Sequence, residues 1–264
     1  MAETINLEKA VLTDLALAVN PVKFAQSLGI DPDPWQRDLL LSAEKRVILN
    51  CARQSGKSTL TAIKALHHAL NNSGALVLVL SPSLRQSGEL FKKIVHFYKD
   101  LGKPIPSETE TALTLQLVNK SRIVSLPGKE QTVRGFSGVS LLVIDEAAQV
   151  ADDLYYSVRP MLAVSQGRLI ILSTPRGKRG FFFKEWSEGV AWRKVKIRAD
   201  QCPRISSSFL KEERAALGEW WFAQEYCCEF NDNISSVFSY DEIMGAFDDD
   251  VKPFFDKDGK LNLM

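Results

Sequence analysis

Residues 51–59 read "CARQSGKST" and decide the fold. The last residues match the end of a phosphate-binding loop, whose full pattern is G-x-x-x-x-G-K-[ST]. Cys51 stands where that pattern has its first glycine, and Arg53 lies inside the loop. The apolar run "RVILNCA" precedes the loop and suits a buried strand, whereas "KSTLTAIKALHHALNN" after it has helical spacing. Strand, loop and helix in this order predict a phosphate loop, whereas an isolated Gly-Lys pair would be read as a surface turn.

The chemistry of such a loop assigns a role to each part. Backbone amides and the helix N-terminus face the phosphates, Lys57 bridges the β and γ oxygens, and the Ser58 hydroxyl ligates Mg²⁺. We therefore expect ATP and Mg²⁺ as cofactors, and contacts with the nucleotide from Arg53, Gln54, Ser55, Gly56, Lys57, Ser58 and Thr59. For Arg53, which we also include among the catalytic residues, a structural salt bridge is the alternative.

A glutamine upstream of the loop favours adenine as the base. Gln36 lies in "PWQRD", on a helix that Asp33 can cap and that Pro34 begins. Its amide can both donate to and accept from an adenine edge.

Two downstream motifs supply the remaining groups. In "LLVIDEAAQ" (141–149) an apolar strand delivers two carboxylates, of which Asp145 would hold Mg²⁺ and Glu146 would deprotonate the attacking water. In "LSTPRG" (172–177) the hydroxyls of Ser173 and Thr174 would sense the nucleotide, and Pro175 would pass its state onward as part of a coupling motif. A helix N-cap and an ordinary turn are the alternatives for these two motifs.

The order of these elements predicts an α/β fold. Strands at 47–51, 75–80, 141–144 and 168–172 alternate with helices, which favours a central, mostly parallel sheet with the ligand at the carboxyl ends of its strands. A β-hairpin is expected within 111–126. We assign 1–180 to the ATPase core with an N-terminal helical segment, 181–236 to a small lid with helices broken near Gly218, and 237–264 to a linker.

Composition sets further limits. Lys and Arg (33) nearly cancel Asp and Glu (32). The net charge of +1 therefore gives no overall electrostatic field that would attract nucleic acid or a membrane. The four cysteines have no C-x-x-C spacing, which favours a reducing, intracellular location over a zinc site or a disulfide framework. No export signal or membrane-spanning run is visible, and no membrane partner is expected.

The motifs together resemble a known family. "PWQRDLL", "CARQSGKST", "LLVIDEAAQ", "STPRG" and "FAQEYCCEF", spread over about residues 21–240, are similar to the N-terminal ATPase domain of the large terminase subunit of tailed bacteriophages. The resemblance implies a P-loop NTPase of the additional-strand catalytic-glutamate type, which hydrolyses ATP to drive double-stranded viral DNA into a procapsid. It further implies a portal protein and a small terminase subunit as partners, a ring usually of five subunits, and a place in the host cell cytoplasm.

Carried over by motif, the resemblance puts Gln36 on the glutamine that contacts adenine, Asp145 and Glu146 on the Mg²⁺ and water-activating pair, and Ser173 to Pro175 on the coupling motif. Arg134, in "TVRGFSGVS", is similar to the arginine finger that acts across subunits, with a salt bridge as its alternative.

DNA contact and DNA cleavage are separate expectations. Candidates for phosphate contacts are the basic residues at the hairpin turn and beside the coupling motif: Lys120, Arg122, Arg176, Lys178 and Arg179. Family members continue into a nuclease domain where this sequence ends, and the run Asp248 to Asp250 is not set among core strands, so we expect no cleavage by this chain. The alternatives are a helicase-like or remodelling ATPase, which needs a second core, and an assembly module that binds ATP with slow turnover.

Overall fold

The computed structural model describes residues 2–128, 135–232 and 240–246, apart from the side chains of residues 2–10 and 241. An eight-stranded sheet runs through its centre in the order β3-β4-β5-β2-β6-β7-β1-β8. The strands are β1 (Arg46–Cys51), β2 (Leu76–Ser81), β3 (Ser107–Glu110), β4 (Thr114–Leu117), β5 (Arg122–Pro127), β6 (Val139–Asp145), β7 (Arg168–Ser173) and β8 (Arg193–Ile197). Arg134 and the run Asp248 to Asp250 lie outside the described residues.

The strand pairs from β5 to β8 are all parallel, whereas the pairs β3/β4 and β4/β5 are antiparallel, so β4 alone among these eight strands runs against the others. β4 and β5 form the hairpin predicted within 111–126. β7 lies between β1, which leads into the phosphate loop, and β6, which ends at Asp145. This is the additional strand that the resemblance implies, and it confirms the predicted fold class.

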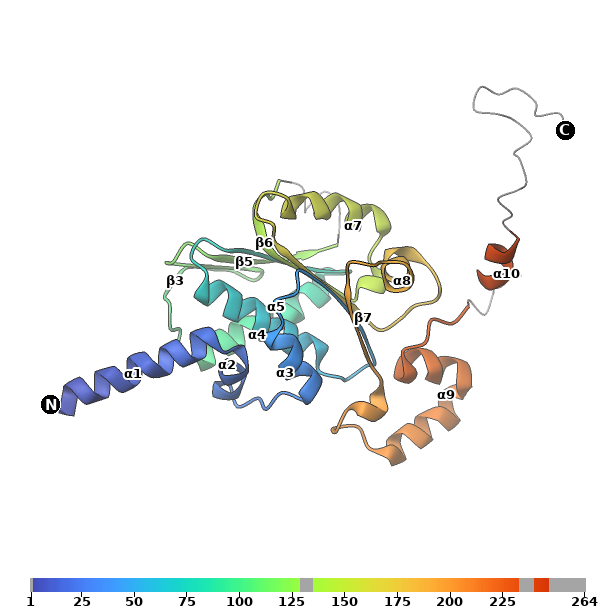
Figure 1. Ribbon diagram of the computed structural model, residues 1–264, viewed down its shortest axis with the longest axis horizontal. Coiled ribbons are helices and arrows are strands. Elements are labelled where there is room, and N and C mark those ends of the chain that lie inside the picture. Colours follow the sequence, from blue (N-terminus) through green and yellow to red (C-terminus); the bar gives the residue numbers. More distant parts are fainter. Residues whose placement is uncertain (1, 129–134, 233–239, 247–264) are drawn as a thin grey trace, which may run out of the picture.

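Helices cover both faces of the sheet (Figure 1). The α-helices are α1 (Ala2–Val19), α2 (Pro21–Ser27), α3 (Pro34–Leu41), α4 (Lys57–Asn71), α5 (Leu84–Asp100), α7 (Asp152–Val158), α8 (Gly180–Ser187), α9 (Ser207–Cys227) and α10 (Tyr240–Gly245), and the short 3-10 helices are η1 (Ala147–Gln149), η2 (Arg159–Leu162) and η3 (Ala199–Gln201). One face carries α2 to α5, and the other carries α7, η2 and α8.

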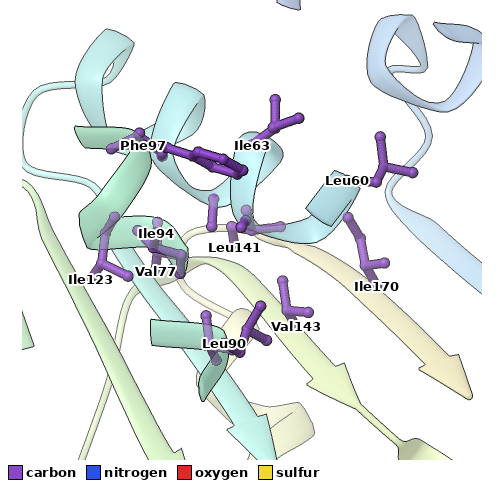
Figure 2. Close-up of a cluster of buried hydrophobic side chains, with 14 of the residues drawn as sticks. Leu60, Ile63, Val77, Leu90, Ile94, Phe97, Ile123, Leu141, Val143 and Ile170 are labelled. Carbon is purple, nitrogen blue, oxygen red and sulfur yellow. The ribbon is translucent and has the colours of Figure 1, made fainter. Parts of the chain in front are cut away.

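The core is divided by the alternation of side chains along each strand. Val77 and Val79 of β2 join the cluster under α4 and α5, whereas Leu78 and Leu80 of the same strand face α7 and α8. Figure 2 shows the first cluster, with α4 and α5 contributing leucine, isoleucine and phenylalanine side chains above the strands. Burial on both faces explains why these strands are continuous apolar runs in the sequence.

The segment expected to form a lid, residues 181–236, is divided between the central sheet and α9. β8 pairs in parallel with β1, so residues 193–197 complete the sheet instead of belonging to the lid, because their backbone groups satisfy the free edge of β1. α8 buries Phe181 and Phe182 against the sheet. Beyond β8, α9 is broken at Gly218, as the sequence predicts. α10 lies within the expected linker, and the ring of Tyr240 at its start meets that of Phe183 edge-on.

Candidate functional site

The phosphate loop begins where β1 ends. Cys51 is the last residue of that strand and is fully buried. Its φ is not positive, so the position does not require glycine and accepts a side chain. Burial raises the pKa of the Cys51 thiol to about 12, which keeps it protonated and unreactive. The left-handed positions fall later in the loop, at Gln54 (φ 60°) and Gly56 (φ 87°). α4 starts directly after Gly56, with its N-terminus toward the loop.

Three strands bring their end groups together around Lys57. The Lys57 ammonium lies 3.5 Å from Glu146 Oε1, at the end of β6, and 3.4 Å from Thr174 Oγ1, just after β7. The Thr174 hydroxyl donates to the Cys51 carbonyl oxygen (3.2 Å), and Ser173 Oγ lies 3.3 Å from Glu146 Oε2. The phosphate-loop lysine, the expected catalytic glutamate and the expected coupling motif are therefore one connected network.

Asp145 has the environment of a magnesium ligand. Its carboxylate is almost fully buried, and this burial, with the charge of Glu146 beside it, raises its pKa to about 6. The Glu146 backbone amide donates to Asp145 Oδ1 (3.0 Å), which fixes the orientation of the group. Mg²⁺ is commonly held by one or two carboxylates, waters and substrate phosphates. One buried carboxylate that feels the charge of the loop lysine Lys57 fits that pattern.

Arg53 pairs with the lid. Its guanidinium hydrogen-bonds to the Glu225 carboxylate, and its backbone amide donates to the Glu225 carbonyl oxygen (3.4 Å). The hydrogen bond to Glu225 is the main reason why the pKa of Arg53 is raised. The salt-bridge alternative for Arg53 is therefore realised, although its side chain is still 66% exposed and borders the cleft described below. Sequence analysis did not assign a role to Glu225, since 172 positions separate the pair.

Gln36 lies behind the loop. Its Oε1 accepts from the Asp33 backbone amide (2.9 Å), and its Nε2 donates to the Ser55 carbonyl oxygen (3.3 Å). Arg204 donates to the same carbonyl (3.3 Å) and binds the Asp33 carboxylate with two hydrogen bonds (2.9 and 2.7 Å). In this structure the Gln36 amide is used within the protein, so its contact with adenine stays a prediction. Arg204 was missed because no local motif marks it.

α5 also contributes to the site. Lys93 donates to the Thr59 hydroxyl (3.0 Å) and is close enough to lower the pKa of Asp145 slightly against the effect of burial. Gln86, two turns earlier on the same face of α5, borders the same cleft. The sequence gives no signal for either residue, because nothing in an amphipathic helix marks the turn that faces a ligand.

Two clefts meet at Arg53 and Glu146. The larger, of about 1170 Å³, runs from α5 over the phosphate loop to α9 and includes Gln54, Gly56, Lys57, Ser58 and Thr59 among its lining residues. The smaller, of about 600 Å³, lies between the coupling motif and the second half of α9. Thr174 and Pro175 line this second cleft, so the expected coupling motif faces a space that Glu146 also borders.

The basic residues expected to contact DNA phosphates fall into two separate groups. Arg122 begins β5 and is in register with the first residue of β2, so it lies with Lys120 at the amino ends of the parallel strands. Lys120 pairs with Glu108 there (2.5 Å). Arg176, Lys178 and Arg179 line the smaller cleft at the carboxyl ends, where Lys178 also lies 3.3 Å from Asp232. The two groups are therefore at opposite edges of the sheet.

Comparison with known proteins gives one consistent result. Residues 48–244 match the family described as "Terminase large subunit, T4likevirus-type, N-terminal". The large terminase subunit of Thermus virus P23-45 is 26% identical over an alignment of 254 residues, and the match covers 82% of this chain and 52% of that protein. The same values hold for the large subunit of Thermus phage G20c. The chain thus spans about half the length of these relatives.

Solved structures share the fold. The large terminase ATPase domain of Thermus phage P74-26 has a TM-score of 0.69 at 22% identity, with 79% of this chain and 97% of that one covered. The large terminase of a thermophilic bacteriophage, solved in complex with ATP-gamma-S, has a TM-score of 0.58 at 12% identity, with 71% and 48% covered. Among the described residues of this protein, no helix is long and apolar enough to cross a membrane.

Proposed function

Since this chain belongs to the T4likevirus-type family of terminase large-subunit N-terminal domains, we propose that it hydrolyses ATP to move double-stranded viral DNA into a procapsid. The observation that carries the proposal is the network of Lys57, Glu146, Ser173 and Thr174, which links the phosphate loop, the water-activating carboxylate and the coupling motif. The thermophilic bacteriophage terminase that was solved with ATP-gamma-S shares this fold, which supports a nucleotide in the cleft.

The proposed mechanism assigns one task to each side chain. Amides of residues 54–59 and the N-terminus of α4 bind the triphosphate, and Lys57 bridges its β and γ oxygens. Asp145 and Ser58 would hold Mg²⁺, which neutralises charge on the phosphates when it is bound. Glu146 takes a proton from the water that attacks the γ-phosphorus atom, because its carboxylate is held beside Lys57 at the end of β6.

Coupling would follow from the contacts of Ser173 with Glu146 and of Thr174 with Lys57. Loss of the γ-phosphate changes the charge beside Lys57, and this change alters the interaction of the Lys57 ammonium with the Thr174 hydroxyl, 3.4 Å away. Pro175 is the last residue of the coupling motif and borders the smaller cleft. Arg176, Lys178 and Arg179 line the same cleft and are the candidates for contacts with DNA phosphates. Lys120 and Arg122 form the second group of candidates. Any contact that they make with DNA phosphates would be separate from the first, because they lie at the amino ends of the parallel strands.

We further propose that subunits form a ring on a portal protein in the host cytoplasm, that a small terminase subunit selects the genome, and that Arg134 completes the site of a neighbour. These partners are those that the family implies. The proposal does not extend to DNA cleavage.

Replacement of Glu146 by glutamine tests the mechanism. We expect Glu146→Gln to bind ATP with the affinity of the unmodified protein and to lose at least about a hundredfold in turnover, because the amide accepts no proton from water. Equilibrium binding of ATP and steady-state phosphate release measure the two quantities. Glu188→Gln, which changes an exposed carboxylate at the end of α8, is the matched control and should leave both unchanged. Unchanged turnover in Glu146→Gln would remove Glu146 from the mechanism.

A further inference from the structure

Lys93 of α5 lines the larger cleft beside the phosphate loop. Its half-buried ammonium donates to the neutral Thr59 hydroxyl (3.0 Å), and among the described residues no carboxylate forms an ion pair with it. We propose that Lys93 is a second phosphate-binding cation, which contacts the γ-phosphate of the nucleotide from α5. The inference rests on the proposed ATPase function and names a side chain by which the site distinguishes ATP from ADP.

The other two lysines of α5 are neutralised within the protein. The Lys92 ammonium lies 3.0 Å from Glu89, and that of Lys99 lies 3.0 Å from Glu110. A partly buried charge without an opposite charge costs free energy, and an anion that binds beside it removes this cost. A lysine ammonium has three donors, of which Lys93 uses one for its hydroxyl partner. Two donors are therefore left for the oxygens of a ligand.

The order of the strands puts α5 on the side of the γ-phosphate. The proposed general base, Glu146, follows β6, and β2, which leads into α5, pairs with β6. The phosphate loop follows β1, and β7 separates β1 from β6. Lys93 lines the same cleft as Lys57, Ser58 and Glu146. A triphosphate that extends from the loop toward Glu146 therefore approaches α5 with its γ end.

The charge of Lys93 acts on the expected magnesium ligand. Burial raises the pKa of Asp145 to about 6, and the positive charges of Lys57 and Lys93 oppose that rise. A cation that favours the anionic form of Asp145 also favours other anions beside this carboxylate. Lys57 begins α4, and Lys93 lies in α5, which packs beside α4 (Figure 1). The expected phosphate site is thus faced by two ammonium groups from neighbouring helices.

The corner between β2 and β6 is polar although it is buried. Ser81 ends β2 and is fully buried, and its hydroxyl has no hydrogen-bond partner among the described residues. Leu80 is in register with Ile144, so Ser81 lies beside Asp145. Side-chain alternation turns both toward α4 and α5, since Val79, two residues before Ser81, belongs to the cluster under these helices. Buried hydroxyls are normally hydrogen-bonded, so an unpartnered one supports a polar ligand at this corner.

Removal of the Lys93 charge separates the γ-phosphate from the rest of the nucleotide. In a Glu146→Gln background, which prevents turnover, Mg²⁺ complexes of ATP and ADP are titrated calorimetrically. We expect Lys93→Met, which keeps the aliphatic chain, to weaken ATP binding about tenfold or more, as loss of a hydrogen bond between charged groups does. ADP affinity should stay within about twofold, because ADP has no γ-phosphate. Lys92→Met removes the adjacent, exposed lysine as the matched control and should alter neither affinity.

A second variant guards against an effect on the fold. Lys93→Gln can keep a hydrogen bond with Thr59 but carries no charge, so it should show the same selective loss of ATP affinity. Urea unfolding without nucleotide should give both variants the midpoint of their Glu146→Gln parent, because the partner that they lose is a neutral hydroxyl.

Each alternative result has a distinct meaning. ATP affinity unaffected by Lys93→Met or by Lys93→Gln overturns the proposal and leaves Lys93 as a structural contact between α4 and α5. Equal losses for ATP and ADP overturn the contact with the γ-phosphate in favour of a general disturbance of the loop. If the Glu146→Gln protein with Lys93 intact binds neither nucleotide, it is the proposed ATPase function that fails.

Discussion

Glu146 leaves β6 in a left-handed backbone conformation, with φ 49° and ψ 43°, which a residue with a side chain adopts only at a cost of about 1–3 kcal/mol. Two neighbours then hold its carboxylate: Lys57 lies at one oxygen and the Ser173 hydroxyl at the other. The backbone strain and these two contacts aim a single carboxylate at the cleft. Ser173, which we propose as a coupling residue, thereby also holds the carboxylate that we propose as the general base.

Loss of the Ser173 hydroxyl is expected to reduce turnover without weakening nucleotide binding. A hydrogen bond to a charged group contributes about 1.5 kcal/mol or more, which corresponds to about tenfold in kcat. KM for ATP should stay within about twofold, because Lys57 and the loop amides are unchanged. Steady-state ATPase assays of Ser173→Ala separate the two parameters. Ser187→Ala, which removes an exposed hydroxyl of α8, should behave as the unmodified protein; a rise in KM alone for Ser173→Ala would assign Ser173 to binding.

At the scale of elements, α9 is two helices joined at Gly218. There φ is 74° and ψ is 166°, a region essentially restricted to glycine. A Cβ atom at this position would meet nothing within 4 Å, so only the backbone conformation requires the glycine. The second half of α9 carries Glu225, which pairs with Arg53, and Tyr226, which lines the larger cleft. The break therefore sets where the lid meets the phosphate loop.

Alanine at Gly218 should destabilise the protein by about 1–3 kcal/mol, because alanine is strained in that conformation. Gly88 provides a control of opposite sign. It lies within α5 with an ordinary φ and open space around its Cα, so Gly88→Ala should stabilise by about 0.5–1 kcal/mol. Urea unfolding of both variants gives the two differences in free energy. A neutral or stabilising Gly218→Ala would show that α9 can run straight through this position.

The elements also show what the sequence can and cannot predict. Periodicity and the three motifs predict β1, β6 and β7 and the groups at their ends, because these signals are local. The sequence predicts β8 as part of the lid, since the alternating pattern in "WRKVKIRA" does not tell which strand it will pair with. The contacts of Arg204 with Asp33 and of Arg53 with Glu225 join residues more than 170 positions apart, and no local pattern contains them.

At the scale of the whole molecule, the proposed catalytic carboxylate of Glu146 is reached from two sides. Glu146 borders the larger cleft, which extends over the phosphate loop, and the smaller one beside the coupling motif. Glu146 is also only partly covered by its own chain, with 24% of its side chain exposed. A site that is open in this way has room for a group from a neighbouring subunit, as the proposed ring requires.

A mixing experiment tests that arrangement. Arg134→Ala subunits keep Glu146, and Glu146→Gln subunits keep Arg134, so each variant alone should lack turnover while still binding ATP. If the arginine acts across the interface, random rings mixed in equal amounts contain both intact groups at about a quarter of their interfaces, and about that share of the normal ATPase activity should return. Specific activity should also rise steeply with protein concentration, because sites are completed only on assembly. No recovery at any ratio, in mixtures shown by light scattering to form rings, would place Arg134 in its own subunit's site or in a structural role.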